Sequence, residues 1–146
     1  MSFDFAVFDP ERAPKDAKAF RAWYDEKMDW DIDAPDPQPE ILTAPLRSWY
    51  SAMAAQYPDL NRGGADALDA IDYSFTADFI YCSMAPELGD EAWALAASKA
   101  GELGLGTYNC MSDDGRNNQA IVFPGGPLAS DPSFLSRLFG KATDRQ

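Results

Sequence analysis

The chain opens with an alternation of apolar and polar positions. In the stretch SFDFAVFD, Phe3, Phe5 and Val7 are separated by single residues, beginning with Asp4. A period of two is typical of a strand with one buried face. Pro10 ends the pattern, because proline lacks the backbone N–H that a strand ladder uses. The sequence therefore predicts a first, half-buried strand before Pro10.

Two later stretches repeat apolar residues every three or four positions, which is the spacing of one helix face. Residues 15–30 form the first stretch, whose apolar residues are Phe20, Trp23, Tyr24 and Met28. The second begins near Thr43, a residue type that caps helices, and ends before Pro58. Its apolar residues are Leu46, Trp49, Tyr50, Met53 and Tyr57. Prolines at alternate positions between the two stretches exclude a regular helix there and indicate an extended linker.

The second half of the chain predicts two strand pairs and two helices. IDYSFTA and FIYCSMA are separated by little more than Asp78, as in a tight hairpin. Asp90 is expected to cap a third helix, EAWALAASKAGELG, which ends at Gly104 and Gly106. TYNCM and AIVFP form the last strand pair. PSFLSRLF is expected to be a short helix that packs through Phe134, Leu135, Leu138 and Phe139.

These elements predict an α+β fold in the order β-α-α-β-β-α-β-β, followed by the short C-terminal helix. Helices and hairpins are segregated along the chain, which favours a mostly antiparallel sheet with the helices packed on one face. A length of 146 residues, with 46% apolar residues and no internal repeat, indicates a single globular domain over residues 1–146.

Several kinds of chemistry lack the residues that they need. The chain contains no histidine, which excludes Ser-His-Asp and Cys-His catalysis and removes the commonest transition-metal ligand. Neither GxxxxGK[ST] nor GxGxxG is present, so no phosphate-binding loop is predicted. Cys82 and Cys110 lie in apolar segments without CxxC spacing and are expected to be buried, unreactive thiols. The sequence therefore predicts no catalytic residue, no metal ligand and no cofactor.

Acidic residues outnumber basic ones twofold. Twenty-four Asp and Glu against twelve Lys and Arg give a net charge of −12. Such a chain repels nucleic acid and anionic membranes and attracts basic proteins, although the same charge also serves solubility. No apolar run approaches the roughly 18 residues that span a bilayer, and MSFDFAVFD lacks the basic region of a signal peptide. We therefore expect a cytoplasmic protein that binds neither nucleic acid nor membrane.

The segment from Tyr24 to Glu40 is the candidate binding surface. It contains seven acids and one base, Lys27. Asp25 and Asp29 stand four residues apart at the end of a helix, where they repel each other and oppose the helix dipole. Aromatic residues among acids are typical of an interface directed at Lys and Arg; the alternative is a solvated, proline-stiffened loop. The predicted partner-binding residues are Tyr24, Asp25, Glu26, Asp29, Trp30, Asp31, Asp33, Asp36 and Glu40.

The stretch SDDGRNNQ, residues 112–119, concentrates carboxylates and amides between two predicted strands. A calcium loop alternates its oxygen ligands and ends on a glutamate. Here Asp113 and Asp114 directly precede Gly115, and no glutamate follows. Asp-Gly and Asn-Asn tolerate the positive φ of hairpin turns. A turn is therefore predicted at this position in preference to a metal site.

Four stretches, SFDFAVFDPERAP, AAQYPDL, FIYCSMAPELGDEAW and GLGTYNCM, follow one another over most of the chain. Together they resemble a family of small bacterial proteins, several of which look like immunity proteins of polymorphic or contact-delivered toxin systems. This chain departs from the family pattern in its long SDDGRNNQ turn and its C-terminal helix. The resemblance brings no catalytic residues and implies a cytosolic protein that binds and neutralises a cognate toxin.

An acidic binder of this kind suits a basic toxin surface, such as the active cleft of a nuclease. The expected partner is therefore a cognate protein toxin. The residues leave two alternatives open: a small enzyme or small-molecule-binding protein that does not use histidine, and a structural subunit whose acidity serves only solubility.

Overall fold

The computed structural model describes residues 1–31, 33–116 and 118–127. Its α-helices are α1 (Ala17–Lys27), α2 (Ala44–Gln56) and α3 (Pro86–Leu103). Its strands are β1 (Phe3–Phe8), β2 (Asp72–Thr76), β3 (Phe79–Met84), β4 (Gly106–Asn109), β5 (Ile121–Phe123) and β6 (Gly126–Pro127). Short 3-10 helices span Pro39–Ile41, Cys110–Ser112 and Asn118–Ala120. The helix expected from PSFLSRLF lies outside the described residues.

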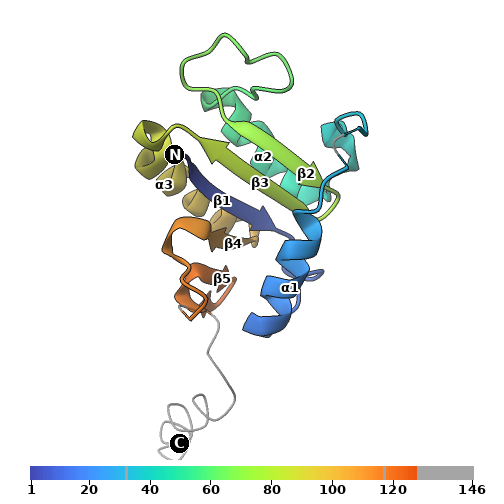
Figure 1. Ribbon diagram of the computed structural model, residues 1–146, viewed down its shortest axis with the longest axis vertical. Coiled ribbons are helices and arrows are strands. Elements are labelled where there is room, and N and C mark those ends of the chain that lie inside the picture. Colours follow the sequence, from blue (N-terminus) through green and yellow to red (C-terminus); the bar gives the residue numbers. More distant parts are fainter. Residues whose placement is uncertain (32, 117, 128–146) are drawn as a thin grey trace, which may run out of the picture.

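The six strands form one antiparallel sheet in the order β2-β3-β1-β4-β5-β6. The first strand of the chain therefore lies inside the sheet, where β1 pairs with β3 on one side and β4 on the other (Figure 1). β2 and β3 form the predicted hairpin, and only Ala77 and Asp78 connect them. The α+β class, the antiparallel sheet and the order of the elements as far as β5 are confirmed, whereas the short strand β6 was not predicted.

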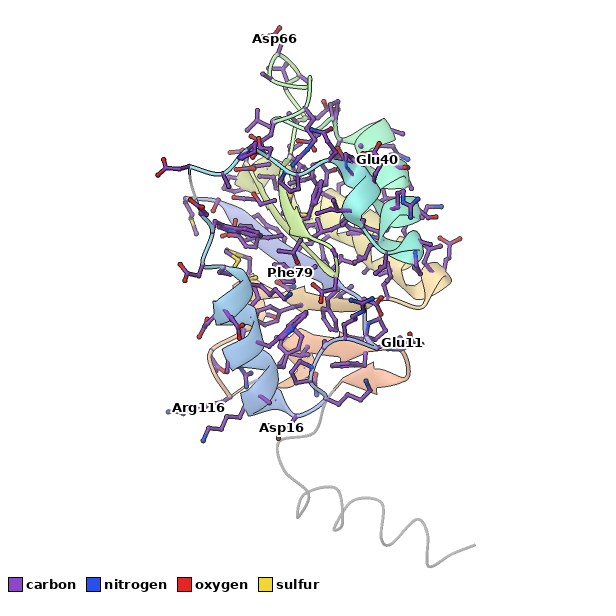
Figure 2. The ribbon with its side chains drawn as sticks, turned by 90° about the vertical axis from the view of Figure 1, so that its right-hand side faces the viewer. Glu11, Asp16, Glu40, Asp66, Phe79 and Arg116 are labelled. Atoms are coloured by element: carbon purple, nitrogen blue, oxygen red, sulfur yellow. The ribbon has the colours of Figure 1, made fainter. Side chains whose placement is uncertain are left out.

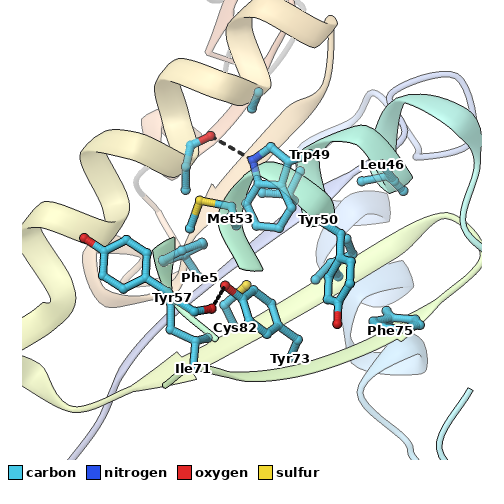
Figure 3. Close-up of a cluster of buried hydrophobic side chains, with 14 of the residues drawn as sticks. Phe5, Leu46, Trp49, Tyr50, Met53, Tyr57, Ile71, Tyr73, Phe75 and Cys82 are labelled. Atoms are coloured by element: carbon cyan, nitrogen blue, oxygen red, sulfur yellow. Dashed lines mark hydrogen bonds between the residues drawn. The ribbon is translucent and has the colours of Figure 1, made fainter. Parts of the chain in front are cut away.

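The placement of the helices differs from the prediction in one respect. α2 and α3 pack together on one face of the sheet, where the indole N–H of Trp49 donates to the carbonyl of Ala96 at 3.0 Å (Figure 3). α1 belongs to a second core cluster on the opposite face, where the ring of Phe20 lies 4.8 Å from that of Phe8. The expectation that all helices share one face is therefore wrong for α1.

β1 shows why both faces are covered. Phe5 and Val7 belong to the cluster under α2 and α3, whereas Ala6 and Phe8 belong to the cluster under α1, and all four are fully buried. The strand is thus buried on both faces over its last four residues rather than half-buried. Burying a large apolar side chain contributes about 1.5–3 kcal/mol, so the second cluster stabilises the fold substantially.

The helix termini follow the predicted signals in two of three cases. Thr43 occupies the N-cap position of α2, although its hydroxyl makes no capping hydrogen bond, and Gly104 ends α3 in the left-handed conformation with φ of +71°. α3, however, begins at Pro86 instead of after Asp90, because proline fits a first turn and Ala85 takes the cap position. Asp90 is an exposed residue inside the helix. Among the described residues no helix is both long enough and apolar enough to cross a membrane.

Candidate functional site

Residues 24–40, called the acidic segment below, run from the last turn of α1 to the 3-10 helix before α2. Part of the segment lies beside the hairpin strand β2, at the upper end of the view in Figure 2, where Glu40 is labelled. All seven acids of the segment are exposed. Within the described part of the chain none of the seven forms an ion pair. The structure thus presents these carboxylates to solvent with their charges uncompensated by a contacting base.

Lys27, the one base of the segment, points back to the sheet. Its Nζ lies 2.9 Å from Oδ1 of Asp78 in the β2–β3 hairpin and 5.3 Å from the centroid of the Trp23 ring. Burial acts to raise the pKa of Asp78, but hydrogen bonds from Lys27 and from the Thr76 hydroxyl outweigh burial and lower it. Lys27, the only base of the acidic segment, is therefore paired with Asp78.

The two aromatic residues predicted to bind a partner lie in different surroundings. Tyr24 packs its ring 5.7 Å from Phe79 and 4.7 Å from Tyr108, and its hydroxyl lies 3.3 Å from Sγ of Cys110. Burial and the contact with Cys110 raise the pKa of Tyr24. Its ring therefore supports the second core cluster. Trp30 is only partly buried and borders a surface groove.

An arginine outside the segment holds it in place, and no local pattern in the sequence indicates this role. The Nε and Nη2 atoms of Arg62 donate to the carbonyl of Pro37 at 3.2 and 3.0 Å. Its Nη1 donates to Oδ2 of Asp59 at 2.8 Å and to the carbonyl of Tyr73 at 3.1 Å. The guanidinium also stacks 4.3 Å above the ring of Phe75. Arg62 therefore joins the acidic segment to β2.

Asp59, the partner of Arg62, is one of two buried polar side chains in the described core, with 5% exposure. Besides Arg62 it accepts a hydrogen bond from the Tyr50 hydroxyl at 2.6 Å and one from the Asn61 backbone N–H at 2.8 Å. A buried carboxylate is stable when such bonds replace its water. The partners of Asp59 lie two, three and nine positions away in the sequence, and Arg62 extends the network to the carbonyl of Pro37, 25 positions away.

A groove of about 400 Å³ separates the acidic segment from β2. One wall is formed by residues 34–37 and the other by residues 74–76. Trp30, Asp31 and Arg62 complete the lining. Of the seven acids, Asp31 and Asp36 thus border the groove, while Asp33 lies on the same segment outside it.

The stretch SDDGRNNQ joins β4 to β5, as predicted, but it is more than a tight turn. Two 3-10 helices flank its centre, and Asp113 folds back to receive Nη2 of Arg21 at 2.9 Å and Nε at 3.1 Å. The Tyr108 hydroxyl and the Gly115 backbone N–H also donate to Asp113. Burial acts to raise the pKa of Asp113, but these hydrogen bonds prevail and lower it. Asp113 therefore fastens this connection to α1.

The remaining reactive groups are held in their neutral forms. Both cysteines are free. Burial raises the pKa of Cys110 to about 11 and that of Cys82 well above its ordinary value. Both are therefore protonated thiols at neutral pH, in which form they are poor nucleophiles. Within the described residues, no group of three or more Cys, Asp or Glu side chains is arranged to hold a metal ion.

Comparisons with protein-family models, with curated proteins and with solved structures found no match.

Proposed function

We propose that this protein is a non-catalytic binding protein of the immunity type, which uses the acidic segment to cover a basic surface of a cognate toxin. One observation carries the proposal: seven exposed carboxylates crowd residues 24–40, and Lys27, the only base among them, is bound to Asp78. Like charges gathered in one segment repel one another, and a basic partner relieves that repulsion.

Electrostatics gives such a surface a defined kinetic signature. Complementary charges speed the diffusional encounter of two proteins, and salt weakens this effect because the Debye length is about 8 Å at physiological ionic strength. With a net charge of −12, the protein is attracted to a basic partner before contact. Association should therefore be fast at low salt and slow at high salt.

The segment is also held in shape before any partner arrives. Arg62 binds the carbonyl of Pro37, and the Asp31 carboxylate accepts from the backbone N–H of Asp33 at 3.0 Å. The prolines restrict the backbone further. A pre-organised segment loses less conformational entropy on binding than a free chain of the same composition. The immunity role itself is supported by the resemblance of four sequence stretches to that family.

A pull-down from native lysate with the tagged full chain, at low and high salt, tests the proposal. The wild-type protein should retain a basic protein at low salt and lose most of it at high salt. A triple variant with Asp25→Lys, Asp29→Lys and Asp33→Lys should fold normally but associate with that protein at least tenfold more slowly, measured by surface plasmon resonance.

A second triple variant provides the matched control. Glu11→Lys, Glu87→Lys and Asp90→Lys change the net charge by the same amount at exposed positions outside the acidic segment. This control should keep most of the association rate. Equal loss in both variants would show that total charge, and not the acidic segment, attracts the partner. Retention of no basic protein at either salt would reject the proposal.

A further inference from the structure

Most backbone N–H and C=O groups along the outer edge of β2 have hydrogen-bond partners, but some do not. In an antiparallel strand, alternate residues direct both the N–H and the C=O toward the same neighbour. Thr76 pairs with Phe79 across the two-residue connection, so the even-numbered residues of β2 face β3. The odd-numbered residues therefore face outward, away from the sheet. The carbonyl of Tyr73 confirms this direction, because it accepts from Arg62 and Asn61, which lie outside the sheet.

Three outward positions along this edge have partners from neighbouring loops. Ile71 donates to the carbonyl of Pro58 and accepts from the N–H of Leu60, both at 2.9 Å. Tyr73 accepts from the Arg62 side chain at 3.1 Å. Beyond the strand, the carbonyl of Ala77 accepts from the N–H of Thr43 at 2.9 Å. The loops at both ends of β2 therefore take up most of the backbone groups that an edge strand usually exposes, although the N–H of Tyr73 has no partner among the described residues.

Phe75 differs from these positions because both of its backbone groups lack a partner among the described residues, whereas at Tyr73 only the N–H does. The alternation directs its N–H and C=O outward, yet within the part of the chain that the structure describes neither group has a hydrogen-bond partner. The residue is only 2% exposed, and peptide groups at such low exposure are almost always paired. Phe75 is also a lining residue of the groove between β2 and the acidic segment. The residue with the unpaired N–H and C=O groups therefore lines the groove.

The charge around the groove defines what can enter it. Asp31 and Asp36 border the groove and form no ion pair with any described residue. Arg62 also lines it, but its charge is compensated by Asp59 and its donors are directed at Pro37, Tyr73 and Asp59. A cationic occupant is therefore favoured. A second copy of this chain is disfavoured, because it would bring two acidic segments together.

We propose that the groove receives an extended segment of the basic partner, which adds to the edge of β2. A residue of that segment exchanges backbone hydrogen bonds with Phe75, and its neighbouring Lys or Arg side chains reach Asp31 and Asp36. Strand addition of this kind obtains affinity from main-chain bonds and selectivity from side-chain contacts. This inference rests on the proposed function and deepens it by naming where and how the partner binds.

The test uses the isotope-labelled full chain and the capped peptide Lys-Val-Lys-Val-Lys as the probe. Binding should shift the amide signal of Phe75 in NMR spectra and slow its hydrogen exchange. The same peptide N-methylated at every backbone nitrogen keeps its charges but donates no backbone hydrogen bond. It should bind about fivefold more weakly, as expected for the loss of the one hydrogen bond that the peptide donates to the carbonyl of Phe75.

A matched pair of variants separates the groove from general attraction. Asp36→Asn removes a charge that borders the groove, and Asp33→Asn removes one on the same segment outside it. The first should weaken peptide binding about twofold to fivefold, which is the range for an exposed ion pair, and the second by less than that. Such a difference, together with the response of the Phe75 amide, supports strand addition.

Three results would overturn the inference. Equal binding of the N-methylated peptide, or equal effects of the two variants, would mean that charge alone attracts the peptide; the proposed function would then stand without the groove. No peptide binding would reject the groove, while the pull-down would still decide the proposed function. Protection of the Phe75 amide that rises with protein concentration, with a dimer in sedimentation, would identify a second copy as the occupant.

Discussion

Replacement of Arg62 by methionine tests whether the ion pair with Asp59 holds the acidic segment to the sheet. Methionine keeps an unbranched apolar stem that can pack on the ring of Phe75, but it loses every hydrogen bond of the guanidinium. Those bonds reach the carbonyls of Pro37 and Tyr73 and the carboxylate of Asp59. The segment would then lose its link to β2.

The size of the effect follows from the burial of the two partners. The side chains of Arg62 and Asp59 are 12% and 3% exposed, so the substitution leaves a buried carboxylate without its counter-charge. Breaking a buried pair in this way costs about 3–5 kcal/mol. Tyr50 and the Asn61 N–H still donate to Asp59, which places the expected loss at the lower end, about 3 kcal/mol. For a chain of this size that corresponds to a fall in Tm of about 10 °C.

Urea unfolding followed by tryptophan fluorescence at neutral pH measures this loss. Arg47→Met serves as the control, because Arg47 is exposed and donates one long hydrogen bond of 3.3 Å to Leu42. It should change the free energy of unfolding by less than about 0.5 kcal/mol. Adding Asp59→Asn to Arg62→Met should cost less than the sum of the single effects, since asparagine removes the stranded charge. A loss below about 1 kcal/mol for Arg62→Met would refute the reasoning.

Three further predictions concern packing, acid stability and ionisation. An alanine Cβ at Gly89 would lie 2.3 Å from the ring of Phe3, whereas one at Gly101 in the same helix would meet nothing within 4 Å. Gly89→Ala should therefore destabilise the protein by about 1–3 kcal/mol in thermal unfolding, and Gly101→Ala should stabilise it by up to about 1 kcal/mol; equal effects would contradict the packing described. The pKa of Asp113 is lower in the folded than in the unfolded protein, so its bonds to Arg21 stabilise the fold above the ordinary Asp pKa and are lost as the pH falls toward the folded value. Asp113→Asn should flatten the loss of stability in acid, and an unchanged pH profile would disprove that contribution. Burial raises the pKa of all six tyrosines, so roughly one pH unit above their ordinary pKa of about 10 the native protein should show far less tyrosinate absorbance than the urea-unfolded chain; matching spectra would argue against this burial.

The local pattern of the sequence predicts most elements of this fold. Alternation marks β1, two stretches with a tight connection mark β2 and β3, three- and four-residue spacing marks α1 and α2, and Thr43 and Gly104 mark helix ends. These signals are local because backbone hydrogen bonding in a helix or hairpin joins residues close in sequence. The early start of α3 escaped prediction because the capping signal of Asp90 competed with that of Pro86, and both were locally reasonable.

The exposed acids of the candidate site could also be predicted from sequence, since charged side chains are rarely buried without a partner. The long-range ion pairs of the neighbouring basic residues could not be predicted in this way. Lys27 binds Asp78 51 positions away, and Arg21 binds Asp113 92 positions away. Whether a base compensates its neighbours or turns to a distant acid depends on which strands pair, and that order is absent from local periodicity.

The face on which α1 packs, and the groove beside Phe75, were likewise decided only by the tertiary structure. A strand whose odd and even residues are both apolar at its end can accept a helix on either side. Pairing with β3 and β4 placed β1 inside the sheet and made burial of both its faces favourable. The same sheet order left β2 at the edge, where Thr43 and the loop of residues 58–62 meet most of its outward backbone groups, but no described residue meets those of Phe75. Sequence determined which residues are apolar, charged or rigid; the long-range pairing of strands determined which of them became neighbours, because those contacts form only when the whole sheet is assembled.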